Sequence, residues 1–188
     1  AGEAHIDPWS TVFKTLSLSG NNAKLYVETQ ASTAKGKGET RLVARLLDAK
    51  GKAVAQKNLT TNTQGAASAQ FDVANAKAWS PEQPHLYTLE INLYQGNKLV
   101  DRLRQRVGIR TIAVSKEHGF QLNGVSRKFK GVCLHHDLGP LGAAVNKAAI
   151  IRQIRLMKDM GVDAIRTSHN MPSQMQMEVC DSMGMMGM

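Results

Sequence analysis

Cysteine is scarce in this 188-residue sequence, and its two residues, Cys133 and Cys180, lack the paired spacing of a metal site. Both lie among apolar residues, which predicts buried free thiols rather than a disulfide or a reactive nucleophile. No uninterrupted apolar run reaches the roughly 18 residues of a membrane-spanning helix, so no membrane partner is expected. Apolar residues still make up 42% of the chain, which is enough for a packed globular core.

Aromatic residues are also few, at 5% of the chain, although the net charge is +9. Two basic clusters are interleaved with glycine and alanine: Lys35 with Lys37, and Lys50 with Lys52 and Lys57. Neither cluster contains an aromatic ring that could stack on a base. Solvated loops account for these clusters, so no nucleic-acid partner is expected.

The N-terminus lacks the basic segment and apolar run of a signal peptide, so none is expected. A trimmed or mature protein would look the same. The compartment therefore stays open, and the cytoplasm or periplasm of a bacterium would both fit.

Short apolar runs dominate the chain from about Trp9 to Thr111. The clearest runs cover residues 23–29, 41–47, 68–73, 86–94 and 98–110. Apolar and polar residues alternate with a period of two, turn residues separate the runs, and no helical periodicity is evident. The pattern predicts an antiparallel sandwich of about seven strands.

The pattern changes after Val114, and all nine methionines lie between Met157 and Met188. The expected elements are a hairpin turned at Asn123-Gly124, a strand at 131–134, a helix from Asn146 to Met160, a strand at 162–167 and a helix opened by Pro172. Met185 and Met186 are expected to begin a third strand that Gly187 breaks. Alternation of strand and helix is typical of parallel α/β structure.

Four segments in this order resemble glycoside hydrolase family 2, and its β-galactosidase-like members in particular. They are residues 78–87, residues 106–110, residues 122–124 with 130–135, and residues 164–172. The resemblance implies an immunoglobulin-like β-sandwich domain over residues 1–113. It also implies that residues 114–188 are the N-terminal part of a TIM (β/α)8 barrel, limited to its first βα units.

The resemblance implies substrate-binding roles for His135 and His169, which would hold the sugar, and for Arg166, which would support the catalytic carboxylates. Their positions agree with this, because side chains at the C-terminal ends of barrel strands face the active site. The residues alone also allow His169 to satisfy backbone groups in a turn and Arg166 to pair with a structural carboxylate. No metal site is expected at His135-His136-Asp137, since adjacent side chains on a strand point apart.

Trp79, between the sandwich runs, has two interpretations. An exposed indole could form a platform for a sugar, but we expect Trp79 to plug the edge of the sandwich. Trp9 allows the same two interpretations.

The acidic residues after Val114 match neither catalytic carboxylate of the family, and a retaining glycosidase needs two such groups about 5–5.5 Å apart. We therefore expect part of a retaining enzyme that hydrolyses terminal β-D-galactosides, inactive as this chain alone. The alternative is a non-catalytic β-sandwich module that binds carbohydrate or another partner. No cofactor is expected within the chain. A metal ion in the full enzyme, a homo-oligomer, and glucuronide or mannoside specificity stay open.

Overall fold

The computed structural model describes residues 4–33, 40–61 and 66–187, so Lys35 and Lys37 lie outside the described residues. The chain folds into two compact units. The first comprises the chain up to Lys77 together with Leu86–Thr111, and the second comprises Ala78–His85 together with the chain from Ile112 onward. None of the described helices is long and apolar enough to span a membrane.

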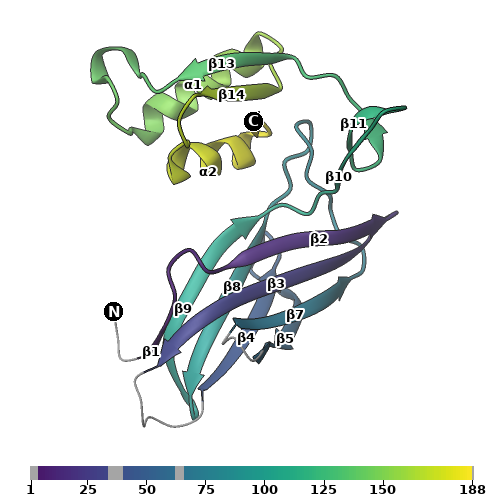
Figure 1. Cartoon of the computed structure of the whole chain (residues 1–188), viewed down its shortest axis with the longest axis vertical. Helices are drawn as coiled ribbons and strands as arrows, with labels where there is room; N and C mark the ends of the chain where they lie inside the picture. The colour runs from purple at the N-terminus through teal and green to yellow at the C-terminus, as the bar shows by residue number, and fades with distance from the viewer. Residues whose placement is uncertain (1–3, 34–39, 62–65, 188) are drawn as a thin grey trace. The chain divides into compact units, whose positions relative to one another are not determined.

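The first unit is a sandwich of two antiparallel sheets (Figure 1). One sheet has the order β1-β3-β7-β6, with β2 also paired to β3. Its strands are β1 (Ala4–Ile6), β2 (Val12–Ser19), β3 (Asn22–Thr33), β6 (Thr60–Thr61) and β7 (Ala66–Val73). The other sheet has the order β5-β4-β8-β9. Its strands are β4 (Thr40–Leu47), β5 (Ala53–Asn58), β8 (Tyr87–Gln95) and β9 (Lys98–Val107).

The predicted sandwich is confirmed, but its described residues contain nine strands rather than about seven. Two of the additional strands are only two or three residues long, which is too short for a period-two pattern to register. Strand β2 changes register between Thr15 and Ser17, and this bulge interrupts its alternation.

Alternation along the strands supplies the sandwich core. Leu89, Ile91 and Leu93 are fully buried on one face of β8, and Leu25 and Val27 are fully buried on β3. Every second side chain of a strand points to the same face, so these strands place their apolar residues together.

The second unit begins with a small antiparallel sheet, ordered β10 (Ile112–Ser115), β11 (Gly119–Leu122) and β12 (Val125–Ser126). The predicted turn lies between β11 and β12, where Leu122 pairs with Val125. Asn123 has a φ of 52° and Gly124 a φ of 79°. Two consecutive positive φ values characterise the type I′ hairpin turn, which Asn-Gly favours because both residues tolerate this backbone.

A three-stranded parallel sheet follows, ordered β13 (Gly131–His135), β14 (Ala164–Ser168) and β15 (Met186–Gly187). Short helix η1 (Gly139–Leu141) and helix α1 (Lys147–Asp159) connect β13 to β14, and α2 (Gln174–Met183) connects β14 to β15. The prediction that Gly187 breaks the third strand is wrong, because Gly187 pairs with Ile165 of β14. Pairing uses the backbone, which a glycine provides as any residue does.

Both helices begin at a side-chain cap. Asn146 caps α1 as predicted and accepts a hydrogen bond from the Ala149 amide at 3.1 Å. The start of α2 differs from the prediction, since Ser173 rather than Pro172 caps it and accepts from the Gln176 amide at 3.2 Å. A serine hydroxyl satisfies an otherwise unpaired amide of the first turn.

The apolar faces of the helices pack with the parallel sheet into a second core. Ile150 and Ile154 of α1 are 4% and 0% exposed, and Val179 of α2 is 2% exposed. They pack in one cluster with Ile165 of β14 and with Met185. The helix faces that were predicted from the spacing of apolar residues are therefore buried.

Trp79 belongs to this second unit, so the prediction that it plugs the sandwich edge is wrong. It is 1% exposed, and its indole Nε1 donates to the Asp181 carbonyl at 2.7 Å. Its own carbonyl accepts from Asn123 Nδ2 at 3.0 Å. Trp9 is 88% exposed in a turn, so it does not plug the sandwich edge, and its role as a platform for a sugar stays a prediction.

Candidate carbohydrate-binding site

The candidate site lies at the carboxyl end of the parallel sheet. Strands β13 and β14 are parallel and in register, with Cys133 opposite Arg166 and His135 opposite Ser168. Opposed residues of neighbouring strands point to the same face of a sheet. One face of the strand pair therefore carries Cys133, His135, Arg166 and Ser168, and we call these residues together with His169 the sheet-end cluster.

The opposite face of the same strands is apolar. Val132, Leu134 and Ile165 pack in the cluster that contains the inner faces of α1 and α2. The strands are thus held from behind by a packed core, and the polar groups of the sheet-end cluster are carried on a fixed backbone.

Arg166 organises the cluster. Its Nη1 donates to Ser168 Oγ at 3.1 Å, and its Nη2 lies 3.1 Å from His169 Nδ1. A guanidinium group has no acceptor, so His169 Nδ1 must accept, and the proton of the neutral ring then resides on Nε2. Arg166 therefore sets the tautomer of His169 as well as its position.

The two histidines that were predicted to bind substrate lie next to each other. The rings of His135 and His169 are arranged edge to face, with centroids 6.4 Å apart and planes at 88°. His169 follows β14 directly, after a cis peptide bond from Ser168. The structure thus brings His135, Arg166 and His169 together, although they are separated by up to 34 residues in sequence.

Cys133 is exposed, so the prediction that it is buried is wrong, whereas Cys180 is buried as expected. Cys133 sits two residues before His135 and therefore on the polar face of β13. The Ser168 hydroxyl and then the Arg166 guanidinium lower the pKa of the Cys133 thiol. Burial raises the pKa of Cys180 to about 12.

Sequence reasoning missed Cys133 and Ser168 as members of the cluster. The signal was present, because each lies two residues from a predicted site residue on the same strand. Extending the period of two from His135 and Arg166 would have identified both.

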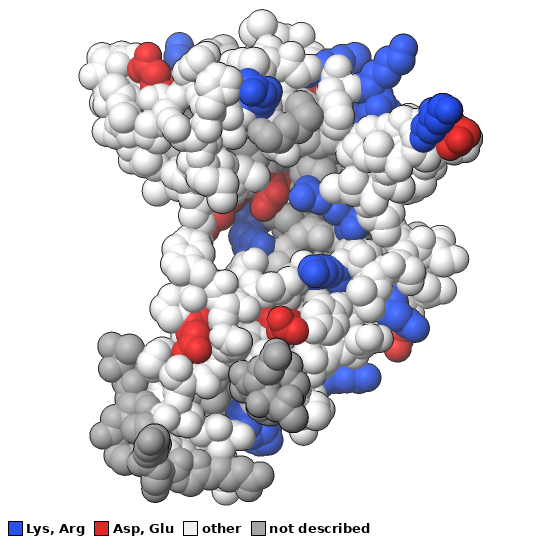
Figure 2. All heavy atoms as spheres, viewed as in Figure 1, with Lys and Arg blue, Asp and Glu red and all other residues white. Residues whose placement is uncertain are grey.

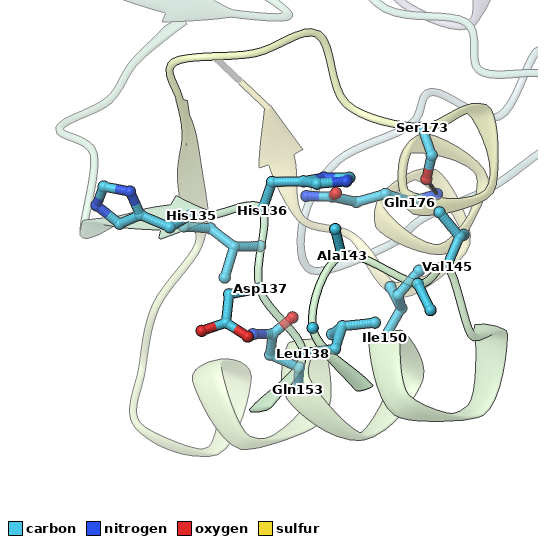
Figure 3. A pocket seen from close by; sticks show the side chains of 13 residues that line it. His135, His136, Asp137, Leu138, Ala143, Val145, Ile150, Gln153, Ser173 and Gln176 are labelled. Carbon is cyan, nitrogen blue, oxygen red and sulfur yellow. Dashed lines mark hydrogen bonds between the residues drawn. The ribbon is translucent and has the colours of Figure 1, made fainter. Parts of the chain in front are cut away.

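A small cavity lies beside the cluster, behind the end of β13 (Figure 3). Its volume of about 20 Å³ is close to that of one water molecule. Polar side chains in its lining include His136, Gln153 and Gln176. Figure 3 shows the ring of His135, the last residue of β13, pointing away from that of His136, which follows the strand.

The acidic residues next to β13 and β14, as far as the structure describes the chain, are engaged in local structural contacts. In the described ranges, no three His, Cys, Asp or Glu side chains are grouped to hold a metal ion. Asp137 Oδ1 accepts a hydrogen bond from the Gly139 amide at 2.8 Å and so stabilises the loop in which it lies. Asp163 precedes β14, at the opposite end of the strand from His169, and binds Arg127 at 3.0 Å.

The chain matches two family models that together cover nearly its whole length. "Glycosyl hydrolases family 2" matches residues 4–110, and "Glycosyl hydrolases family 2, TIM barrel domain" matches residues 112–188. This chain belongs to glycosyl hydrolases family 2. The sandwich is therefore the family's sandwich domain, and the parallel βα units are the start of its TIM barrel domain.

Individual family 2 proteins resemble the chain along most of its length. The β-galactosidase BoGH2A of Bacteroides ovatus is 38% identical over 97% of this chain. A putative β-glucuronidase of Formosa agariphila is 35% identical over 98% of it. The chain spans 22% and 18% of these two proteins.

Solved structures of the family agree with the fold. The crystal structure of a family 2 member from Bacteroides cellulosilyticus superposes with a TM-score of 0.91 at 35% identity. The match covers 98% of this chain and 26% of that one.

Proposed function

We propose that this chain supplies the sugar-holding edge of a retaining β-glycosidase that hydrolyses terminal β-D-galactosides. The observation that carries the proposal is the meeting of His135, Arg166 and His169 at the ends of two adjacent parallel barrel strands. Positive charge develops on the sugar ring in the transition state, and hydrogen bonds to the hydroxyls strengthen there. The acid/base and nucleophile carboxylates would come from residues outside this chain, so the chain alone would be inactive.

Each member of the cluster has a distinct role in this proposal. The imidazoles of His135 and His169 hydrogen-bond sugar hydroxyls, and His169 presents Nε2–H as a donor because Arg166 occupies Nδ1. Arg166 remains charged at any physiological pH, so it supports a carboxylate electrostatically and transfers no proton.

The choice of galactoside is supported by the relative that is 38% identical and named a β-galactosidase. A glucuronide is the second candidate, because a relative at 35% identity is named a putative β-glucuronidase. A glucuronide carries its own carboxylate, which requires a cationic partner. Arg166 is the one cation of the sheet-end cluster, and we assign it to the catalytic carboxylates.

Hybrid enzymes test the proposal. In one hybrid the chain replaces the matching residues of the Bacteroides ovatus β-galactosidase, and in another those of the Formosa agariphila protein. We expect aryl β-galactoside hydrolysis by the first and no glucuronide hydrolysis by the second. His135→Ala and His169→Ala should each lower kcat/KM about 100-fold, which corresponds to about 2.7 kcal/mol of transition-state stabilisation.

His118→Ala is the matched control, because His118 is exposed in the turn between β10 and β11. It should leave kcat/KM unchanged. The 188-residue chain by itself should not hydrolyse the aryl β-galactoside. Glucuronide hydrolysis by the second hybrid, without galactoside hydrolysis by the first, would show that the substrate is a glucuronide. Equal effects of His118→Ala and His135→Ala on kcat/KM would show that the sheet-end cluster does not hold the sugar.

A further inference from the structure

The sheet of β4, β5, β8 and β9 carries charged residues on the face opposite the sandwich core. Glu90 of β8 pairs with Arg45 of β4 on one side and with Arg104 of β9 on the other. Directly opposed residues share a face, and the neighbours of Glu90 along β8, Leu89 and Ile91, point into the core. The arginines therefore lie on the outer face of the sandwich.

Strand β9 presents a row of arginines on this face. Arg102, Arg104 and Arg106 alternate along the strand, so their side chains emerge about 7 Å apart on one side. The side chains of Arg102 and Arg104 are 41% and 59% exposed. Arg106 is also exposed. The row can therefore reach successive anionic groups of an extended polymer.

Glu90 shows how this face holds a carboxylate. Its carboxylate is 1% exposed, and it accepts from Arg45 Nη1 at 2.9 Å and lies 2.7 Å from Arg104 Nη2. Burial raises the pKa of Glu90, but hydrogen bonds from Arg104 and Asn92 and the nearby arginine charges outweigh it, so the pKa is lowered. Three arginines, Arg45, Arg102 and Arg104, lie within 4 Å of the Glu90 carboxylate, so the positive charge on this face exceeds the single negative charge of Glu90.

Amide side chains extend the face beyond the arginines. Gln56 of β5 pairs with Arg45, and Asn58 of the same strand pairs with Val43, so both belong to the outer face. Both are exposed. Amide groups both donate and accept, which suits the hydroxyl groups of a sugar.

The aromatic residue on this face is already engaged by an arginine, which counts against the stacking of nucleic-acid bases on it. Tyr94 is the aromatic residue on this side of β8, and the Arg41 guanidinium lies over its ring at 4.5 Å from the centroid. One side of the ring is therefore occupied by the guanidinium. On the face shown in Figure 2, by contrast, basic side chains are scattered among uncharged and acidic ones.

We propose that this outer face binds an acidic polysaccharide. Hexuronate carboxylates bind Arg102 and Arg106, and sugar hydroxyls bind Gln56 and Asn58. Arg45 and Arg104 remain paired with Glu90 and hold the row in place. The choice of a polysaccharide over an acidic polypeptide rests on the amide groups and on the proposed glycosidase function. Such a face would keep the enzyme on a charged polymer while the barrel acts on chain ends.

Binding of the 188-residue chain to polygalacturonate, measured by calorimetry at low salt, tests the proposal. The Arg102→Ala/Arg106→Ala variant should bind at least about tenfold more weakly, since two charge-assisted contacts are lost. Lys50→Ala/Lys52→Ala removes the same charge from an exposed turn and should change the affinity less than about twofold. Both double variants keep Arg45 and Arg104, the nearest partners of Glu90, but Arg102→Ala removes a contact with Glu90 at 3.9 Å and a hydrogen bond to Asn92 Oδ1 at 2.7 Å. Thermal unfolding therefore checks that both variants remain folded.

Neutral dextran and polyglutamate complete the test. The chain should not bind dextran, and it should bind polyglutamate more weakly than polygalacturonate. Equal weakening by both double variants would show diffuse charge attraction, and tighter binding of polyglutamate would show a polypeptide partner. Either result, or no binding of polygalacturonate, overturns this proposal. The hybrid-enzyme assay does not depend on this face, so the two proposals fail separately.

Discussion

At the scale of single residues, the sheet-end cluster combines contacts between near neighbours on β14 with contacts across to β13. Arg166 binds Ser168 and His169, two and three residues further along the chain, and Cys133 stands across from it on β13. Strand β14 and the residue after it thus supply Arg166, Ser168 and His169 from one short segment, and β13 supplies Cys133 and His135. The same guanidinium that orients His169 also favours the thiolate of Cys133.

The two cysteines should therefore react very differently. Cys133 is exposed and its thiol pKa is lowered, whereas Cys180 is buried and its pKa is raised to about 12. The thiolate is the reactive form, so iodoacetamide at pH 7.5 should alkylate Cys133 at least about tenfold faster. Mass spectrometry of peptides over time measures both rates.

Arg166→Gln should slow the alkylation of Cys133, because it removes a positive charge that stabilises the thiolate. Arg152→Gln, an exposed position on α1, is the control and should leave the rate unchanged. Equal rates for the two cysteines would contradict the exposure and the electrostatics described for Cys133.

At the scale of elements, the segment Ala78–His85 is the least expected feature. It lies between sandwich strands β7 and β8 in sequence, yet it packs within the second unit. Lys158 Nζ donates to the Pro81 carbonyl at 3.1 Å and to the Gly184 carbonyl at 3.2 Å. Arg127 bridges Glu82 and Asp163. The segment thus contacts the end of α2 through the backbone at Pro81 and Gly184.

Gly184 should be the most sensitive position of this contact. It ends α2 with a φ of 69°, and a Cβ there would lie 2.3 Å from the Pro81 oxygen. Gly184→Ala therefore adds a clash with the Pro81 backbone to the strain of the left-handed conformation. We expect the free energy of unfolding to fall by about 2–4 kcal/mol. Urea unfolding followed by the fluorescence of the buried Trp79 measures it.

Gly161→Ala is the matched control. Gly161 follows α1 with a φ of 84°, and a Cβ there would meet no atom within 4 Å. Its free energy of unfolding should fall by only about 1 kcal/mol, the cost of the left-handed backbone for alanine. Similar losses for both variants would show that the contact with Pro81 does not matter.

At the scale of the whole molecule, the two units differ in how completely they are closed. The sandwich has two sheets and a large common core. The second unit has a smaller core, and the parallel strands β13 and β15 each pair on one side only within the described residues. Its sheet nevertheless covers Ile150 and Ile154, so the helices bury their apolar faces.

We expect the second unit to open more readily than the sandwich. Few buried side chains and unpaired strand edges lower the free energy of local unfolding. Hydrogen exchange of the chain at low micromolar concentration should therefore be much faster for amides in residues 146–183 than for those in 86–94. Equal protection of both regions in a proven monomer would show that these few βα units are as stable as the sandwich.

Much of the local structure follows from sequence alone. The period-two pattern in residues 41–47 and 86–94 predicted strands β4 and β8, since every second side chain of a strand points to the same face. The Asn146 cap and the Asn123-Gly124 turn were equally predictable, because each depends on the conformational preferences of adjacent residues. These features need no knowledge of the rest of the molecule.

Tertiary structure decided where distant residues meet. Trp79 is buried and donates to the backbone carbonyl of Asp181, a residue 102 positions away, and nothing near Trp79 in sequence specifies that partner. The burial of Cys180 and the exposure of Cys133 likewise depend on which strand faces pack against α1 and α2. Sequence preferences act over a few residues, whereas burial is a property of the whole packed unit, so it appears only once the strands and helices have assembled.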